Sequence, residues 1–306
     1  MKRTLIAYII LFSCGITVYA QLEPLHNQYQ LNGLAINPAF AGADEALSIT
    51  LLQRNQWVGF EGAPTTSTFA IHSPMKRENL ALGFLVMHDQ IGISRNTSFA
   101  GNYAYRIISP RGTFSFGLGA ALRIQNEALE KLRQLDKDDQ YLPTYSRTYL
   151  LPDFNIGFYY KTKKYYAGIS MLSLLGSQIN TSNGRYGITL DLKHTNYILY
   201  GGYFANLSNG IKINPGTLIK YNLANAFQVD LNLNMVIRDK FWFGTSYRSG
   251  NGMIWLIQFQ ANKQARIAYS YGMDFSTLGN YHKGSHEIML KYVFNYLVES
   301  VSPQQF

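Results

Sequence analysis

The stretch FQVDLNLNMVIR, residues 227–238, alternates between apolar and polar side chains along nearly its whole length. Successive side chains of a β-strand point to opposite faces, so one face of this strand is wholly apolar and the other almost wholly polar. The same alternation recurs in residues 98–107, 113–123 and 267–274. The pattern predicts a chain built of β-strands, each with one face in an apolar environment.

Strand length indicates which apolar environment this is. Reading the alternation from Ala46 onward gives about fourteen strands, most of them about ten residues long. Soluble strands usually have about five or six residues, whereas a tilted membrane strand needs about 9–11. We therefore expect an all-β protein, a transmembrane antiparallel β-barrel. The strands should begin near residues 46, 65, 79, 95, 113, 152, 164, 195, 211, 226, 240, 251, 264 and 284.

The connections between these strands alternate in length. Membrane barrels have short periplasmic turns and longer outer loops. The three longest expected connections, residues 125–151, 173–194 and 274–284, all fall on the outer side of the ring. A soluble β-sandwich gives no reason for short and long connections to alternate in this way. The expected short periplasmic turns are residues 73–79, 109–112, 161–164, 207–210, 238–240 and 262–264.

The first twenty residues are typical of an export signal. Lys2 and Arg3 precede an apolar run, and Val18-Tyr19-Ala20 provides a cleavage site with a small final residue. Lipidation at Cys14 is an alternative, but the apolar run continues past it. An uncleaved anchor is another alternative, but the run is short for a span of about 20 residues. Downstream of Ala20 no apolar run approaches spanning length, so insertion must use strands.

These features divide the chain into four parts. Residues 1–20 are the expected signal peptide, and 46–295 the outer-membrane β-barrel. Residues 21–45 are polar and rich in turn formers, and they are expected to enter the barrel as an N-terminal hatch or plug. Residues 296–306 are expected to form a short periplasmic tail. Inward-facing glycines would leave room for the plug, although they would equally permit strand bending. These glycines are Gly117, Gly119, Gly157, Gly202, Gly244 and Gly272.

The sequence gives no sign of catalysis. The only cysteine, Cys14, lies in the export signal, which excludes disulfides and thiolate metal sites in the mature chain. The 6 histidines are scattered, and neither a nucleophile elbow nor an HExxH helix is present. Asp136-Lys137-Asp138-Asp139 lacks the glycine and glutamate of a calcium loop and is better interpreted as a solvated charge run. We expect no enzyme, no cofactor and no bound metal.

Basic residues concentrate in the expected periplasmic turns. The chain carries a net charge of +9, and removing Lys2 and Arg3 leaves +9 − 2 = +7. Export from the cytoplasm argues against nucleic acid as a partner. The charges could attract anionic outer-membrane lipid, or they could dock an acidic periplasmic protein. The residues concerned are Lys76, Arg77, Arg111, Lys161, Lys163, Lys164, Arg238, Lys240 and Lys263.

Several segments resemble those of one family. They are Asn37-Pro38-Ala39-Phe40-Ala41-Gly42, the thirteen residues from Arg54 to Thr66 (RNQWVGFEGAPTT), His88-Asp89-Gln90-Ile91-Gly92, Tyr269-Ser270-Tyr271 and Gly284-Ser285-His286-Glu287-Ile288. Together they resemble the PorP/SprF family of the type IX secretion system over about residues 21–294. The Asn-Pro-Ala element is also similar to the hatch of FadL-like barrels. One departure is Tyr271-Gly272-Met273-Asp274, where an acid is expected directly after Tyr271.

The resemblance implies an outer-membrane component that supports secretion or surface anchoring of exported proteins such as gliding adhesins. Its partners would be the C-terminal domain of an exported cell-surface protein outside, and peptidoglycan-associated or secretion-motor proteins in the periplasm. The alternative function is a FadL-like or porin-like channel for small or hydrophobic solutes. A third, a lipid-modifying barrel enzyme, lacks a supporting set of residues. Residues singled out for partner binding or structure are Asn37, Pro38, Gly42, Arg54, Gln56, Trp57, Gly59, Gly62, Pro64, His286 and Glu287.

Overall fold

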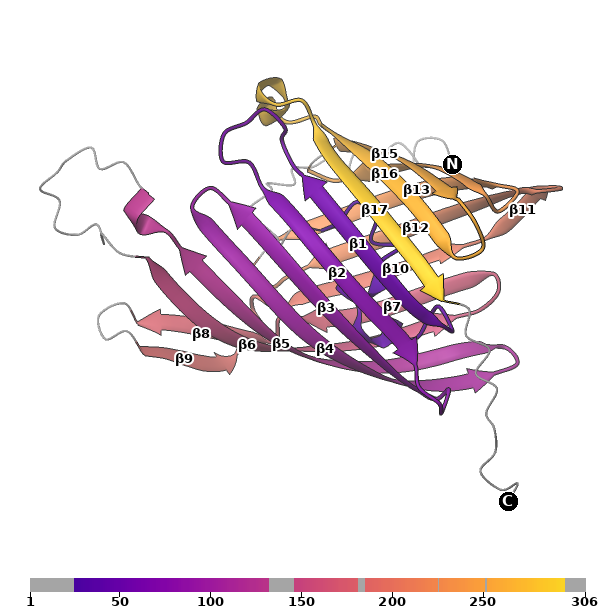
Figure 1. The fold of residues 1–306 in the computed structure, drawn as a ribbon, viewed down its shortest axis with the longest axis horizontal. Helices are drawn as coiled ribbons and strands as arrows, with labels where there is room; N and C mark the ends of the chain where they lie inside the picture. The colour runs from indigo at the N-terminus through magenta and orange to yellow at the C-terminus, as the bar shows by residue number, and fades with distance from the viewer. Residues whose placement is uncertain (1–24, 132–145, 181–184, 225, 251, 295–306) are drawn as a thin grey trace, which may run out of the picture.

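The chain forms a closed antiparallel β-barrel of fourteen strands in a computed structural model that describes residues 25–131, 146–180, 185–224, 226–250 and 252–294 (Figure 1). Strands β1 and β17 pair at one seam, and β10 and β12 pair at another, which closes the ring. The ring strands are β1 (Leu47–Asn55), β2 (Thr65–Pro74), β3 (Leu80–Ile91), β4 (Ser94–Ser109), β5 (Gly112–Glu127), β6 (Arg147–Lys161), β7 (Tyr165–Leu172), β10 (Asn196–Tyr203), β12 (Ile211–Tyr221), β13 (Phe227–Ile237), β14 (Phe241–Arg248), β15 (Gly252–Gln260), β16 (Ala265–Asp274) and β17 (Ser285–Phe294).

Three further strands stand beside this ring. Strand β11 (Ala205–Ser208) extends β10 past Phe204 and pairs with β12. Strands β8 (Leu175–Asn180) and β9 (Arg185–Leu190) form a separate hairpin. The helical turns are η1 (Gly33–Ala35), η2 (Pro38–Phe40), η3 (Leu129–Lys131) and η4 (Thr277–Tyr281). Within the described residues no helix is long and apolar enough to cross a membrane.

The expected fold class is confirmed, and most strands begin within two residues of their expected positions. Two expected loops needed correction. Strands β5 and β6 stay paired up to Glu127 opposite Arg147, a cross-strand pair of opposite charge, so much of 125–151 is strand. The β8–β9 hairpin lies within the loop expected at 173–194.

Alternation sets the two faces of the wall. On β13, Leu231 and Leu233 are 55% and 50% exposed on the outside, whereas Asp230 is fully buried inside. A slip of one residue would carry Asp230 into hydrocarbon, so the register is strongly specified. Large aromatic side chains are exposed near both ends of the wall, as a lipid-facing barrel requires. They include Tyr105, Tyr165, Phe241 and Tyr292 at one end and Tyr221, Tyr247 and Trp255 at the other.

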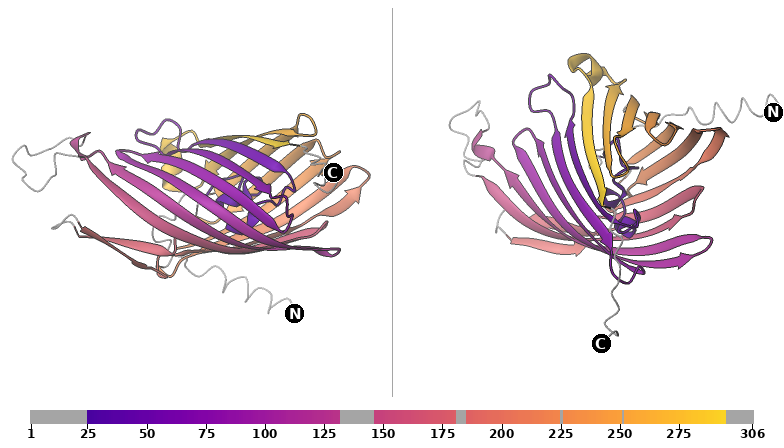
Figure 2. Two further views of the ribbon diagram at one scale, coloured as in Figure 1. Left: turned by 60° about the horizontal axis from the view of Figure 1, so that its bottom comes forward. Right: turned by 45° about the vertical axis from the view of Figure 1, so that its right-hand side comes forward.

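The two ends of the barrel differ. One, called the turn end below, has only short connections, and the other, called the loop end, carries the three longest (Figures 1 and 2). Two loop-end connections, residues 92–93 and 249–251, are nevertheless short. The expectation of short connections therefore holds throughout the turn end, whereas the expectation of longer ones holds for only part of the loop end. The turn-end connections are residues 75–79, 110–111, 162–164, 209–210, 238–240 and 261–264.

Candidate functional site

Residues 25–46, called the inner segment below, run through the interior of the ring (Figure 2). They hydrogen-bond to inward-facing groups on widely separated strands. The Asn37 amide donates to the carbonyl oxygen of Phe158 on β6 at 2.9 Å. Arg248 of β14 donates to the Leu25 carbonyl at 3.1 Å, and Lys291 of β17 donates to the Leu31 carbonyl at 3.0 Å. The inner segment is therefore tied to the wall on several sides of the ring.

Asn37 organises the middle of the inner segment. Its side-chain oxygen accepts from the Ala39 backbone N–H at 2.8 Å and so caps η2, whose first residue is Pro38. Its amide nitrogen also donates to the Tyr200 hydroxyl at 3.3 Å. Ser170 of β7 donates to the neighbouring Ile36 carbonyl. One fully buried amide thus fixes both the local turn and its position against β6 and β10.

Four buried charges hold the start of the inner segment. Glu287 of β17 accepts the backbone N–H groups of Asn27 and Gln28, both at 2.9 Å. Arg54 of β1 lies 3.8 Å from Glu287 and donates to the Leu25 carbonyl at 2.6 Å. Because side chains of two wall strands hold this backbone, the contact joins the inner segment to the seam between β1 and β17.

The second pair of charges approaches from the other side of the inner segment. Arg248 makes a two-pronged contact with Asp230 of β13, with Nη2 at 2.8 Å and Nε at 3.1 Å. The same guanidinium donates to the carbonyl oxygens of Leu25 and His26. Buried charges are tolerated when they are paired and fully hydrogen-bonded, and losing one partner typically costs about 3–5 kcal/mol. This cluster therefore opposes release of the inner segment.

A third attachment lies near the turn end. Asp44 forms an ion pair with Lys291 at 2.7 Å and lies 3.4 Å from His72. Burial disfavours the charged form of Asp44, but Lys291 and His72 outweigh it and hold the pKa of this carboxyl well below its ordinary value. Gly42 adopts a positive φ of 73° and donates its N–H to His72. A Cβ at Gly42 would lie 2.6 Å from that of Ala81, which explains the glycine.

The inward glycines divide into two groups. At Gly117 and Gly157 a Cβ would collide with the inner segment, at Ala39 and Asn37 respectively, so these two make room for it. At Gly119, Gly202 and Gly244 the nearest atoms instead belong to side chains of the barrel wall. Gly272 borders Ser285 and Asn27 without a close contact. The expected room for the plug is therefore found at Gly117 and Gly157, whereas at Gly119, Gly202 and Gly244 the missing Cβ makes room for side chains of neighbouring strands.

The tryptophan-containing segment forms the loop between β1 and β2 at the loop end. Trp57 adopts a positive φ of 48°, and Gly59 and Gly62 have φ of 96° and 73°. Gln56 donates its backbone N–H to the carbonyl oxygen of Pro64 at 2.9 Å, which closes the base of the loop. The Trp57 ring lies 6.2 Å from that of His282. The shape of the loop thus depends on glycines placed where other residues would be strained.

This loop is joined by backbone hydrogen bonds to two neighbours. The Val58 N–H donates to the Gly284 carbonyl at 2.9 Å, and the Lys283 N–H donates back to the Val58 carbonyl at 2.8 Å. On the other side the Gly92 N–H donates to the Gly62 carbonyl at 2.9 Å. The connections after β1, β3 and β16 therefore form one continuous rim.

Two adjacent residues singled out by the sequence point to opposite sides of the wall. Glu287 faces the interior, as described above. His286 faces outward, where its Nδ1 lies 2.7 Å from the Tyr269 hydroxyl and its ring centroid lies 5.2 Å from that of Tyr271. The period of two along a strand makes this separation unavoidable. His286 and Glu287 therefore cannot share one site.

The basic turn residues gather at the turn end, as their strand positions require. Lys76, Arg77, Arg111, Lys163, Lys164, Arg238, Lys240 and Lys263 are exposed, and Lys161 is half-buried. Lys161 donates to the carbonyl oxygen of Ala43 at 2.9 Å and so also holds the inner segment. A cavity of about 420 Å³ opens beneath the inner segment and reaches the turn at Thr162. Among its lining residues are Lys161, Lys163, Arg266 and Lys291.

Sequence reasoning missed half of the buried charge cluster. The alternation places Asp230 on the polar face of its strand, Arg248 is not singled out, and nothing in the sequence pairs two residues from different strands. The available signal is a charged side chain on the inward, mostly polar phase of each strand. Among the described residues no group of three or more His, Cys, Asp or Glu side chains could hold a metal ion. The run Asp136 to Asp139 and the segments 1–20 and 296–306 lie outside the described residues.

Comparison with known structures agrees with the fold. The monoaromatic hydrocarbon channel CymD shares 11% identity at a TM-score of 0.51, with 87% of this chain and 93% of that chain covered. Omp33 of Acinetobacter baumannii gives 8% identity and a TM-score of 0.46, covering 81% and 98%. The P. putida toluene transporter TodX gives 7% and 0.47, covering 85% and 93%. At such identities the likeness to CymD extends to the fold alone.

Comparison of the sequence with known proteins is more specific. No curated protein matches the chain. The family described as "Type IX secretion system membrane protein PorP/SprF" matches residues 18–292, nearly the whole described barrel together with the inner segment. The barrel is therefore an outer-membrane β-barrel that belongs to the PorP/SprF family.

Proposed function

We propose that this barrel is a non-enzymatic component of the type IX secretion system that holds an exported cell-surface protein at its loop end and a periplasmic partner at its turn end. Family membership supports the secretion role. The observation that carries the proposal is the attachment of the inner segment. Buried charges and a buried amide fix it across the lumen, so the surfaces left for partners are the two ends of the barrel.

The loop end offers an apolar contact surface. Phe60, Phe275 and Tyr281 are 44%, 63% and 72% exposed, and Val58 and Ile91 are also exposed. These five residues, called the rim patch below, lie on the connections after β1 and β16 and, for Ile91, at the end of β3. Backbone hydrogen bonds join these parts of the rim to one another. Exposed aromatic side chains are typical anchors of protein interfaces. We assign the rim patch to the C-terminal domain of the exported protein.

The turn end offers a basic surface instead. The exposed basic turn residues lie at this end, and Lys161, Lys163, Arg266 and Lys291 line the cavity beneath the inner segment. Such a field favours an acidic partner and makes its association sensitive to salt. We assign this surface to a peptidoglycan-associated or secretion-motor protein, which places the turn end in the periplasm.

Two matched variants test the assignments in cells of the native species. Phe60→Ser combined with Tyr281→Ser should abolish surface display of the exported protein while periplasmic partners still co-purify with the tagged barrel. Lys163→Glu combined with Lys164→Glu should abolish co-purification of the periplasmic partner while the exported protein still co-purifies with the barrel. Ile288→Val, on the lipid face, is the control. The proposal fails if both double variants insert normally, as judged by heat-dependent gel mobility, and keep full display and both partners.

The alternative of a solute channel has its own measurement. A barrel whose inner segment stays attached should show no stable conductance in a planar bilayer and no uptake of small hydrophobic solutes. Deleting residues 25–46 should create a conductance, because the wall that remains is a closed fourteen-stranded ring. Steady conductance or solute flux through the unaltered protein would favour the channel instead.

A further inference from the structure

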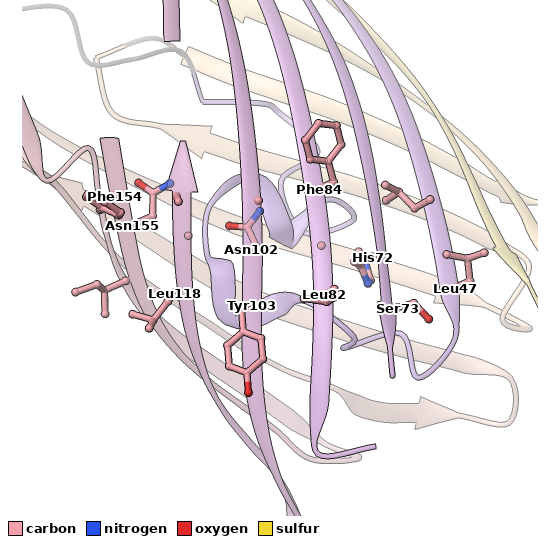
Figure 3. Close-up of a pocket in the computed structure, with 16 residues that line it drawn as sticks. Leu47, His72, Ser73, Leu82, Phe84, Asn102, Tyr103, Leu118, Phe154 and Asn155 are labelled. Atoms are coloured by element: carbon pink, nitrogen blue, oxygen red, sulfur yellow. The ribbon is translucent and has the colours of Figure 1, made fainter. Parts of the chain in front are cut away.

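The outer wall carries an apolar hollow of about 800 Å³ over strands β1 to β6 (Figure 3). The volume lies within the range of small-molecule sites. Figure 3 shows Phe84, Tyr103, Leu118 and Phe154 on the strands that surround it. These four side chains are 42%, 41%, 45% and 52% exposed and belong to the lipid-facing phase of their strands. The hollow therefore faces hydrocarbon, not the lumen.

Strand register explains why the wall is hollowed here. Across four neighbouring strands the residues in one row are Phe84, Gly101, Ala120 and Phe154. The two smallest residues thus lie between two phenylalanine rings. The row below, Leu82, Tyr103, Leu118 and Ile156, is filled by large side chains. The gap is two strands wide and has walls on both sides and a floor of backbone.

Gly101 has no explanation inside the protein. A Cβ built on it meets nothing within 4 Å, unlike those at Gly117 and Gly157, and its backbone does not adopt a positive φ. Strand β4 pairs without a bulge on both sides of it. Glycine within a strand lowers stability by roughly 0.5–1 kcal/mol relative to alanine. An outward glycine with open space in front of it indicates that a molecule outside the barrel approaches closely.

We propose that the hollow binds one acyl chain of an anionic phospholipid of the periplasmic leaflet. Three hairpins contribute strands to the hollow, β2–β3, β4–β5 and β6–β7, and all of them end in basic turns. Five exposed basic residues, Lys76, Arg77, Arg111, Lys163 and Lys164, stand against one acid, Glu78, in these turns. A phospholipid whose acyl chain lies along the strands, from the hollow toward the turn end, places its phosphate among these charges. The choice of leaflet rests on the orientation proposed above.

The energetic reason differs from that of a soluble pocket. Hydrocarbon already surrounds the wall, so no hydrophobic gain selects the occupant. Two contributions favour a phospholipid at this site. Its acyl chain packs closely between the two phenylalanine rings, and its head group is attracted to the basic turns. Both terms predict a lipid that stays bound longer at this site than elsewhere on the wall.

The test uses the full barrel in vesicles that contain a phosphatidylglycerol with a diazirine at the end of one acyl chain. After irradiation, labelled peptides should come mainly from β3 to β6. Gly101→Leu combined with Ala120→Leu should reduce this labelling by about tenfold, equivalent to about 1.4 kcal/mol. Thr245→Leu on β14, seven strands from β4 around the ring, is the matched control and should leave it unchanged.

Three results would overturn the proposal. The first is labelling spread evenly around the wall, and the second is labelling that the filled variant retains. The third is a protein cross-linked at β3 to β6 in place of lipid, which would assign the hollow to a partner barrel. A phosphatidylcholine probe of equal chain length should label more weakly, and equal labelling would be a fourth contrary result because it contradicts the role of the basic turns. None of these outcomes depends on surface display, so failure here is distinguishable from failure of the proposed function.

Discussion

Replacing Glu287 by glutamine should loosen the start of the inner segment while leaving the barrel closed. Both oxygens of this fully buried carboxylate accept backbone N–H groups, from Asn27 and Gln28. Glutamine presents an NH₂ group to one of them, and an unsatisfied buried donor costs about 1–3 kcal/mol. Arg54 also loses its nearest acid. Losing one partner of a buried pair costs about 3–5 kcal/mol when nothing relaxes.

Water can reach the lumen once the segment opens, so the two costs do not add in full. A local loss of about 3 kcal/mol corresponds to a factor of about one hundred in the opening equilibrium. Hydrogen–deuterium exchange of the barrel in lipid nanodiscs measures this factor directly. Amide protection should fall about a hundredfold in residues 25–31 and stay unchanged in residues 37–43, which Asn37 holds independently.

Two controls make the result specific. Ile288→Val alters the adjacent lipid-facing residue and should change nothing in the inner segment. Adding Arg54→Met to Glu287→Gln removes both charges and should recover part of the lost protection, because an unpaired buried charge is worse than none. Unchanged protection in the single variant, or an equal loss in residues 25–31 and 37–43, would refute the role assigned to Glu287.

Three further outcomes can be measured in the same way. Gly117→Val should displace the inner segment and strip protection from residues 37–43, whereas Gly101→Val, with open space before it, should not. Asn37→Ala should destabilise the same region by about 1–3 kcal/mol, since it removes the η2 cap and leaves buried groups unpaired. The pKa of Asp44 is depressed below 3.8, so its ion pair with Lys291 contributes fully above that pH and is lost as pH falls through the lower folded value. The protection factors of residues 40–46 should therefore be unchanged at pH 5 and fall only under strong acid.

Period-two alternation made most of the barrel predictable. It fixes which residues face lipid, and turn-forming residues mark where strands stop. Thr65 and Ile211 begin strands where expected. The pattern fails where pairing, not composition, extends a strand: the cross-strand partners Glu127 and Arg147 lengthen β5 and β6 into what looked like loop. It also missed the β8–β9 hairpin, which forms a separate two-stranded sheet beside the ring.

The interior was less predictable for a different reason. The contacts of Glu287 with Asn27 and Gln28 join residues 260 and 259 positions apart, and no local pattern encodes such a distance. Strand phase alone can place Arg54 on the inward face of β1, but it does not supply the partner. Alternation determines which side of the wall a residue faces, whereas its neighbours inside depend on how the ring closes.

Closure of the ring explains why the distinctive segments near Trp57 and His286 belong together. Strands β1 and β17 pair Arg54 with Glu287 and Asn55 with His286, so the two segments form the seam at which the first and last strands meet. Joining strands so far apart in sequence carries a larger loss of chain entropy than any local hairpin. On the inner side the Arg54–Glu287 pair adds the inner segment to this seam, and on the rim Val58 and Gly284 continue it by backbone pairing. The same few residues therefore close the barrel, fix its interior and shape the rim offered to a partner.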